Sequence, residues 1–153
     1  EAGIGQDHFE AVHLSALTRD LAELYAPLIE DRGFDLKVDI ASDVIVQGHR
    51  ELIVQAIGNL IDNALKYGAS PIHMSVGLGA THAWAEISDR GVGIPVAQRA
   101  EALRRFGRLD PSRTGLGAGL GLSLVQAVAR LHGGSVDLGD AKPGLRIRLS
   151  LPL

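Results

Sequence analysis

Glycine is concentrated in two stretches of this chain, residues 89–95 (Asp-Arg-Gly-Val-Gly-Ile-Pro) and residues 115–122 (Gly-Leu-Gly-Ala-Gly-Leu-Gly-Leu). Backbone that must come close to a polyanion needs residues without a Cβ, and a glycine-rich segment that runs directly into a helix presents free N–H groups to phosphate. An apolar helical pattern follows the second stretch at once, so a plain linker is the weaker interpretation. The two stretches predict a nucleotide-binding domain.

The spacing of apolar residues predicts the elements around these stretches. Intervals of three and four residues predict helices over residues 14–32, 50–67 and 119–131. Strands are predicted where apolar residues alternate or run together, in residues 34–40, 44–46, 72–78, 83–88, 135–138 and 145–151. Residues 90–118 are expected to hold at most a short helix around 96–104, and a connection of that length is typical of a functional lid. The pattern predicts an α+β fold with helices on one face of a mixed, mostly antiparallel sheet.

Length, charge and cysteine content narrow the class of protein. A chain of 153 residues suits one domain, and a net charge of -3 argues against a surface that coats nucleic acid. The absence of cysteine excludes disulfides and cysteine-based metal sites, and it fits the cytoplasm. No apolar run approaches the roughly 18 residues of a membrane span, so this segment is not expected in the membrane. Because it starts at Glu1 and its only methionine is Met74, we expect a piece of a longer protein.

Two asparagines lie one turn apart on the second predicted helix. Asn59 and Asn63 are at positions i and i+4, so their amides project from the same side. Neutral amide oxygens suit an octahedral Mg²⁺ that keeps waters and shares phosphate ligands. The alternative is that both amides cap or bridge neighbouring loops, since asparagine in a helix often bonds locally.

Asp89 follows a predicted strand and precedes Gly91 and Gly93. A carboxylate accepts hydrogen bonds and cannot donate them, so at the floor of a cleft it would select an amino group such as the N6 amine of adenine. The alternative is a plain turn stabilised by aspartate. Other phosphate-binding motifs are absent, because Gly-x-Gly-x-x-Gly fits no register and no Gly-Lys pair exists for a Walker loop. The helix that begins at Gly119 would then offer its N-terminus to a triphosphate.

Arginines gather in the predicted lid around Phe106, at Arg99, Arg104, Arg105, Arg108 and Arg113. They could bind phosphate or an acidic partner surface, and the alternative is a solvated lid anchored by Phe106. The six histidines are scattered, and none has the helical spacing of a zinc site. We expect the histidines to be structural or surface residues.

Taken in order, these segments resemble the ATP-binding catalytic domain of bacterial sensor histidine kinases. This family belongs with gyrase, the heat-shock chaperone of the ninety-kilodalton class and a mismatch-repair ATPase. The resemblance runs from Leu14 to Leu153. Four family boxes occur in the right order: the N box at 59–67 (Asn-Leu-Ile-Asp-Asn-Ala-Leu-Lys-Tyr), the G1 box at 89–95, the F box at 105–108 (Arg-Phe-Gly-Arg) and the G2 box at 117–122 (Gly-Ala-Gly-Leu-Gly-Leu).

The resemblance implies a two-layer α/β sandwich of the Bergerat type, in which ATP lies between helices and a flexible lid. It implies Mg²⁺ near Asn59 and Asn63, and phosphates near Lys66. It also implies the adenine ring near Tyr67, with its amino group on Asp89. The remaining candidate cofactor-binding residues are Gly91, Gly93, Ile94, Phe106, Arg108, Gly117, Gly119, Leu120, Gly121 and Leu122. Residues 13–153 would form this domain, and residues 1–12 the linker from an upstream helical hairpin.

The residue four before Asn63 separates the branches of the family. Hydrolysing relatives carry a glutamate there, whereas Asn59 cannot act as a general base. The resemblance therefore implies phosphoryl transfer to a histidine, with Asn59 and Lys66 as catalytic contributors. The acceptor histidine would lie in the hairpin domain, and a response regulator would be the further partner. The full-length protein could be anchored in the inner membrane.

This chain also departs from the family pattern at two positions. Gly107 stands where the F box usually has a second aromatic residue, and His49 stands where many relatives carry aspartate. These departures keep two alternatives open. One is a degenerate module that senses nucleotide or docks a protein, and the other is a serine kinase of the anti-sigma type.

Overall fold

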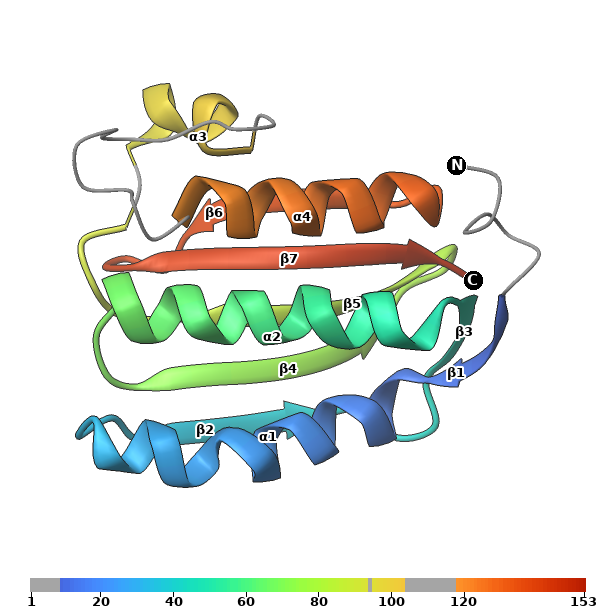
Figure 1. The fold of residues 1–153 in the computed structure, drawn as a ribbon, viewed down its shortest axis with the longest axis horizontal. Coiled ribbons are helices and arrows are strands. Elements are labelled where there is room, and N and C mark those ends of the chain that lie inside the picture. Colours follow the sequence, from blue (N-terminus) through green and yellow to red (C-terminus); the bar gives the residue numbers. More distant parts are fainter. Residues whose placement is uncertain (1–8, 94, 104–117) are drawn as a thin grey trace.

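The computed structural model describes residues 9–93, 95–103 and 118–153. Figure 1 shows one layer of helices in front of one layer of sheet. The elements in chain order are β1 (Glu10–His13), α1 (Leu14–Asp31), β2 (Leu36–Ile40), β3 (Ile45–Gly48), α2 (Arg50–Tyr67), β4 (Ile72–Leu78), β5 (His82–Ser88), α3 (Val96–Leu103), α4 (Ala118–Leu131), β6 (Ser135–Asp140) and β7 (Leu145–Pro152). The predicted α+β class is confirmed.

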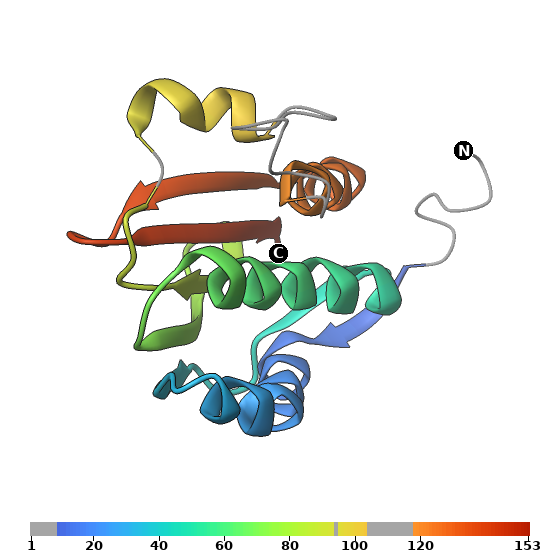
Figure 2. The same ribbon diagram turned by 60° about the vertical axis from the view of Figure 1, so that its left-hand side comes forward.

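The main sheet has five strands in the order β2-β4-β5-β7-β6. Only β2 and β4 are parallel, and the other neighbours are antiparallel, as the sequence predicts. Helices α1, α2 and α4 cover one face of this sheet, and Figure 2 shows the two layers after a turn of the view. The sheet and its helices therefore form a two-layer sandwich with the core between the layers.

Helix α2 lies at the centre of the helical layer, between α1 and α4 (Figure 1). Its side chains at Ile53, Ile57, Leu60 and Ile61 are fully buried, which fixes the face that it turns to the sheet. The imidazole Nδ1 of His49 accepts a hydrogen bond from the backbone N–H of Leu52 and caps the start of the helix. Gly68 ends it. The asparagines of α2 are therefore held on a well-packed element.

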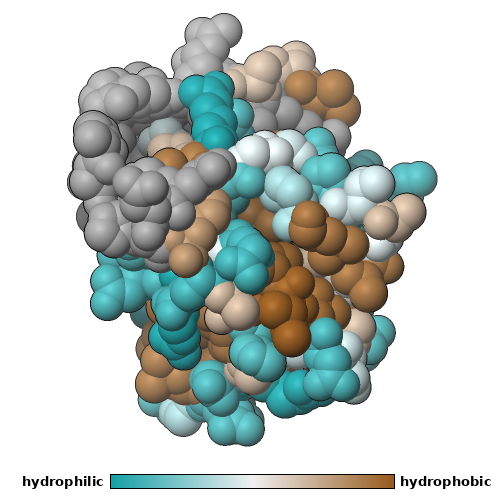
Figure 3. All heavy atoms as spheres, turned by 90° about the vertical axis from the view of Figure 1, so that its right-hand side faces the viewer, coloured by the Kyte–Doolittle hydropathy of each residue, from teal (hydrophilic) through white to brown (hydrophobic). Residues whose placement is uncertain are grey.

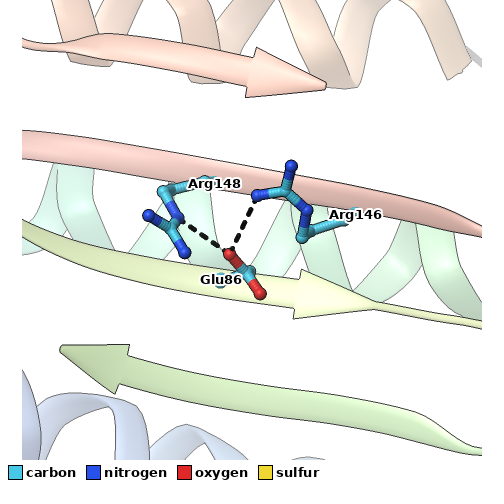
Figure 4. Close-up of polar contacts among 3 residues, drawn as sticks. All are labelled: Glu86, Arg146 and Arg148. Carbon is cyan, nitrogen blue, oxygen red and sulfur yellow. Dashed lines mark hydrogen bonds and ion pairs between the residues drawn. The ribbon is translucent and has the colours of Figure 1, made fainter. Parts of the chain in front are cut away.

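The opposite face of the sheet carries charged and aromatic side chains instead of helices. Glu86 on β5 accepts hydrogen bonds from Arg148 at 2.8 Å and Arg146 at 3.4 Å, both on β7 (Figure 4). The Arg148 guanidinium also lies 4.1 Å from the centre of the Trp84 ring. These contacts tie two central strands together on the side away from the nucleotide-binding residues predicted on the helices.

A second sheet of two strands was not predicted from the sequence. Strand β1 pairs antiparallel with β3, so residues 10–12 form regular structure within the expected linker. Strand β3 consequently does not join β2, which pairs with β4 instead. Ser15, near the start of α1, does not cap that helix; its hydroxyl donates to the carbonyl of Ala41 and accepts from the N–H of Val44. The start of α1 is thus tied to the segment before β3.

Strand β1 and the C-terminus lie at one end of the molecule, at the right of Figure 1. Figure 3 views this end and shows apolar side chains gathered on part of its surface. Leu78, at the end of β4, and the C-terminal Leu153 are both more than half exposed, and the N–H of Leu153 donates to Thr81 in the β4–β5 turn. Within the described ranges, no helix combines the length and apolar character that a membrane crossing requires.

Candidate nucleotide site

Asp89 is a buried carboxylate directly after β5, with only 6% of its surface exposed. Its Oδ1 accepts a hydrogen bond of 2.7 Å from the backbone N–H of Gly91. Burial raises the pKa of Asp89, and hydrogen bonds from the amides of Gly91, Ala69 and Leu145 offset part of that rise. The amides fix the carboxylate as a preorganised acceptor, which suits an exocyclic amino group.

Two glycines allow the end of α2 to approach this carboxylate closely. A Cβ on Gly68 would overlap Cγ of Asp89 and would lie 2.7 Å from the carbonyl oxygen of Ala64. A Cβ on Gly91 would lie 2.9 Å from Cα of Gly68. The N–H of Arg90 also donates to the carbonyl of Ala69 at 2.9 Å. The turn after β5 and the end of α2 are therefore one packed unit, and the sequence marks Gly68 only as the end of a helix.

Asn63 has an amide nitrogen with no partner. Its Nδ2 is buried and makes no hydrogen bond among the described residues, which weakens the interpretation that this side chain only bridges local loops. The amide oxygen and nitrogen of asparagine can exchange places by a flip, so either atom can face a ligand there. Asn63 thus offers a coordinating group that the fold itself does not use.

Asn59 lies one turn earlier on α2. It lines a surface groove of about 390 Å³ together with Tyr25, Asp62 and Leu124. Residues of α1, α2 and α4 form the walls of this groove. Burial raises the pKa of Tyr25, and the negative charge of Asp62 raises it further. The phenol is therefore neutral and can act as a hydrogen-bond donor beside Asn59.

The predicted metal has few other ligands available. In the part of the chain that the structure describes, no three histidine, aspartate or glutamate side chains cluster closely enough to hold an ion. The amide of Asn63, joined by Asn59, would suit Mg²⁺, which keeps several waters and binds substrate phosphates in place of a full protein cage. The residues present therefore fit the ion that the family resemblance implies.

Three of the candidate segments and one further turn meet at one end of the molecule, at the left of Figure 1. The C-terminus of α2, the end of β5, the N-terminus of α4 and the β6–β7 turn all lie there. Lys66 and Tyr67 are exposed on the last turn of α2, with Tyr67 50% accessible. Their side chains are thus available to a ligand next to the Asp89 turn.

The G2 box is only partly described. Gly119, Leu120 and Gly121 lie in the first turn of α4, which begins at Ala118, one residue before the predicted start. The side chain of Leu122 is buried in the core, so only its backbone can face a ligand. The predictions for Ile94, Phe106, Arg108 and Gly117 lie outside the described residues, as do those for Arg104, Arg105 and Arg113.

Gly93 has an additional packing partner. Its φ of +74° is in the left-handed region that favours glycine, and a Cβ there would lie 2.9 Å from the carbonyl oxygen of Gly144. Gly144 and Leu145 belong to the β6–β7 turn and its following strand, which the sequence did not connect with the site. A Lys-Pro-Gly turn is visible in the sequence at residues 142–144, but its partner is not.

Comparison with known proteins adds sequence relatives. The family model described as "Histidine kinase-, DNA gyrase B-, and HSP90-like ATPase" matches residues 48–153. The signal transduction histidine-protein kinase/phosphatase MprB of Mycolicibacterium vanbaalenii is 34% identical over 142 residues, which cover 90% of this chain and 29% of that protein. The adaptive-response sensory kinase SasA of Synechocystis sp. is 32% identical over 156 residues, covering 97% and 40%. The chain thus spans less than half the length of these curated relatives.

Solved structures share the whole fold. The ATP-binding domain of PrrB from Mycobacterium tuberculosis superimposes with a TM-score of 0.79 at 28% identity, covering 95% of this chain and 97% of that one. A mycobacterial sensor histidine kinase MprB structure gives 0.76 at 28%, covering 94% and 97%. The catalytic domain of the histidine kinase ThkA gives 0.83 at 22%, covering 94% and 95%, and this match concerns the fold alone.

Proposed function

Because the chain belongs to the family of histidine kinase-, DNA gyrase B- and HSP90-like ATPases, we propose that it is the ATP-binding catalytic domain of a two-component sensor histidine kinase. In the proposed reaction, the bond between the γ-phosphorus of ATP and its bridging oxygen breaks. A bond forms between that phosphorus and a ring nitrogen of histidine on a separate dimerisation and phosphoacceptor domain. ADP leaves, and the imidazole releases one proton to solvent.

The observation that carries the proposal is the buried carboxylate of Asp89, held by backbone amides beside the end of α2. An acceptor fixed in this way distinguishes a 6-amino purine from a 6-oxo purine, because a carboxylate attracts an amino group and repels a carbonyl oxygen. The exposed Tyr67 would cover the purine ring, and the exposed ammonium of Lys66 would bind the phosphates.

Catalysis in phosphoryl transfer is mainly positioning and charge neutralisation. Asn63 and Asn59 would hold Mg²⁺, which when bound supplies positive charge at the phosphates. Asn59 has an amide where a hydrolysing enzyme needs a general base, so it orients groups without activating water. These residues favour transfer to the acceptor histidine over release of phosphate to water.

The partners follow from this reaction. The acceptor would be a helical hairpin domain of the same protein, and the phosphohistidine formed there would be passed to a response regulator. Because ATP is the donor, we place the domain on the cytoplasmic side of the cell.

Transfer can be tested with the chain and its own upstream hairpin as separate domains. The mixture is incubated with Mg²⁺ and ATP labelled at the γ-phosphate, and we expect label on the hairpin that is lost in acid and kept in base. A hairpin with its acceptor histidine replaced by glutamine is the control and should stay unlabelled.

Other outcomes would identify the competing functions. An acid-stable label would indicate a serine kinase of the anti-sigma type. If a nonhydrolysable ATP analogue gives no calorimetric signal at millimolar concentration, the domain is a docking module. Binding without any transfer to the folded hairpin would contradict the kinase proposal and leave a nucleotide sensor.

A further inference from the structure

We propose that the β6–β7 turn around Gly144 is a positioning element for Asp89 and thereby sets the selectivity of the site for a 6-amino purine. The inference rests on the proposed function, in which Asp89 receives the purine amino group. It assigns a role to residues 140–145, which lie far from the glycine-rich boxes in the sequence.

Backbone contact between the two turns is the first observation. Gly144 has a φ of +114°, and a Cβ on it would overlap the carbonyl oxygen of Asp89. The same Cβ would lie 2.7 Å from the carbonyl carbon of Asp89 and 2.8 Å from Cα of Arg90. These are backbone atoms, which cannot rotate out of the way as a side chain could. Any side chain at position 144 must therefore displace the Asp89 turn or the β6–β7 turn.

Hydrogen bonds join the same two segments. The N–H of Asp89 donates to the carbonyl of Leu145 at 3.0 Å. The first residue of β7 thus holds the backbone of Asp89. The guanidinium of Arg90 adds a bond of 3.2 Å from Nη1 to the carbonyl of Ala141. Through Leu145, a shift of the hairpin changes the position of the carboxylate.

The β6–β7 turn is itself braced, so it can act as a fixed support. The N–H of Ala141 donates to the carbonyl of Gly144 at 3.1 Å, and the N–H of Lys142 donates to the Asp140 carboxylate at 2.9 Å. Gly93 packs on the other side, where its Cβ position lies 2.9 Å from the Gly144 oxygen. Gly144 is therefore enclosed between the two ends of the segment that carries Asp89, Gly91 and Gly93.

Selectivity is the property that this support controls. Discrimination against a 6-oxo purine requires the carboxylate to lie at hydrogen-bond distance from position 6, since a displaced carboxylate neither binds the amino group well nor repels the oxygen strongly. Phosphate contacts would be unaffected by a small shift of Asp89. A change at Gly144 should thus reduce the preference for adenine more than it reduces binding of the phosphates.

The test compares ADP with inosine diphosphate, in which an oxo group replaces the 6-amino group and N1 carries a proton. Dissociation constants are measured by calorimetry for the wild-type chain, Gly144→Ala and Gly33→Ala. Gly33 is the matched control, because its φ of +80° imposes similar backbone strain while its Cβ would meet nothing within 4 Å. We expect the wild type to prefer ADP, Gly144→Ala to lose about tenfold or more of that preference, and Gly33→Ala to keep it.

A second measurement does not depend on nucleotide. The carboxyl carbon of Asp89 is titrated by NMR in the free protein, and Gly144→Ala should raise the pKa of Asp89 above its wild-type value, because displacement of the turn weakens the hydrogen bond from the Gly91 N–H to the carboxylate. Gly33→Ala should leave it unchanged. Arg90→Ala removes one contact to the turn without backbone strain. If Gly144→Ala does not fold, this variant should still lower the ADP preference about threefold.

The outcomes separate the two proposals. A wild-type chain without any preference for ADP would overturn the role of Asp89 and the positioning role together. A wild-type preference that Gly144→Ala and Arg90→Ala both retain, with the pKa of Asp89 unchanged, would overturn the positioning role alone.

Discussion

At the scale of single residues, Asp89 combines two opposing effects. Burial disfavours its charged form, while three amides favour it, and the balance leaves a raised pKa in the folded chain. The carboxylate can therefore accept a further hydrogen bond from a donor on a ligand. The sequence predicts this residue because an aspartate between a strand and Gly-x-Gly is expected at the floor of a cleft beside a tight turn, with a plain aspartate-stabilised turn as the alternative. The amides of Ala69 and Leu145 could not be predicted, since they come from other segments.

Asp89→Asn should weaken binding of a nonhydrolysable ATP analogue by roughly 10- to 100-fold, the usual cost of losing a hydrogen bond to a charged group. The asparagine side chain would also place an NH2 donor where the carboxylate had an acceptor, opposite the amino group of adenine. Calorimetry measures the loss, with Asp137→Asn as the control because that aspartate is exposed on β6. Equal affinity of Asp89→Asn and the wild type would refute the contact with adenine.

Asn63→Ala should weaken binding of the analogue about tenfold in the presence of Mg²⁺ and little in its absence, because the lost group is a metal ligand. The measurement is a pair of titrations, one with excess Mg²⁺ and one with a chelator. Asn63→Asp serves as a second variant, since a carboxylate keeps an oxygen ligand. An equal loss with and without metal would show that Asn63 does not act through Mg²⁺.

His132 gives the domain a predicted dependence on pH. Its Nδ1 donates to the carbonyl of Val128 at 2.7 Å, so its Nε2 is the acceptor for the N–H of His49 at 3.0 Å. Burial lowers the pKa of His132, the Val128 carbonyl raises it in part, and the charge on His49 lowers it again. The folded chain therefore binds this proton less readily than the unfolded chain does.

Stability should consequently be complete above the unfolded pKa of about 6.5 and should fall as pH drops below it toward the lower folded pKa. Urea unfolding at pH 7.5 and at pH 5.5 measures the change. His132→Gln should flatten the dependence, whereas replacement of the exposed His13 by glutamine should not. The idea fails if the wild type is no less stable at the lower pH.

At the scale of elements, α2 joins the core to the site, because Gly68 at its C-terminus packs directly against Asp89. Gly68→Ala should lower the free energy of unfolding by about 1–3 kcal/mol and weaken nucleotide binding, because the new methyl group overlaps Asp89. Gly58→Ala in the same helix is the control. Its Cβ would lie 3.1 Å from the hydroxyl of Tyr25, a half-buried side chain that can shift, and alanine favours helix. Urea denaturation should show lower stability for Gly68→Ala only.

The helices could be predicted almost to the residue, whereas some strand partners could not. Helices α2 and α4 are long and strongly periodic, so local pattern determines them. Strand β1 has four residues, too few for alternation to be recognised, and its partner β3 lies beyond a whole helix. The role of Gly144 could not be predicted for the same reason. Its φ and its contact with Asp89 depend on tertiary structure, which no local sequence pattern contains.

At the scale of the whole molecule, the candidate site lies at one end, and strand β1 and the C-terminus lie at the other (Figure 1). Strand β1 is held by the side chain of Val12, which is 2% exposed, and by backbone pairing with β3. A chain that starts at Leu14 should be less stable than one that starts at Phe9 by about 2–4 kcal/mol, from lost apolar burial and an unpaired strand. Urea unfolding of the two truncated chains is the measurement. Equal stability would mean that β1 is only an attached segment.

The pairing of β1 with β3 also has a mechanical consequence. Glu10 is paired with Gly48, and His49 directly after it caps α2. A force applied to the chain before Glu10 therefore acts first on the Glu10–Gly48 pair, which lies next to the start of α2. A pull along the strands loads all the paired residues of β1 and β3 together and is transmitted to α2. A pull perpendicular to the strands separates these pairs one after another. The force that the β1–β3 pair withstands should therefore depend on the direction of the pull.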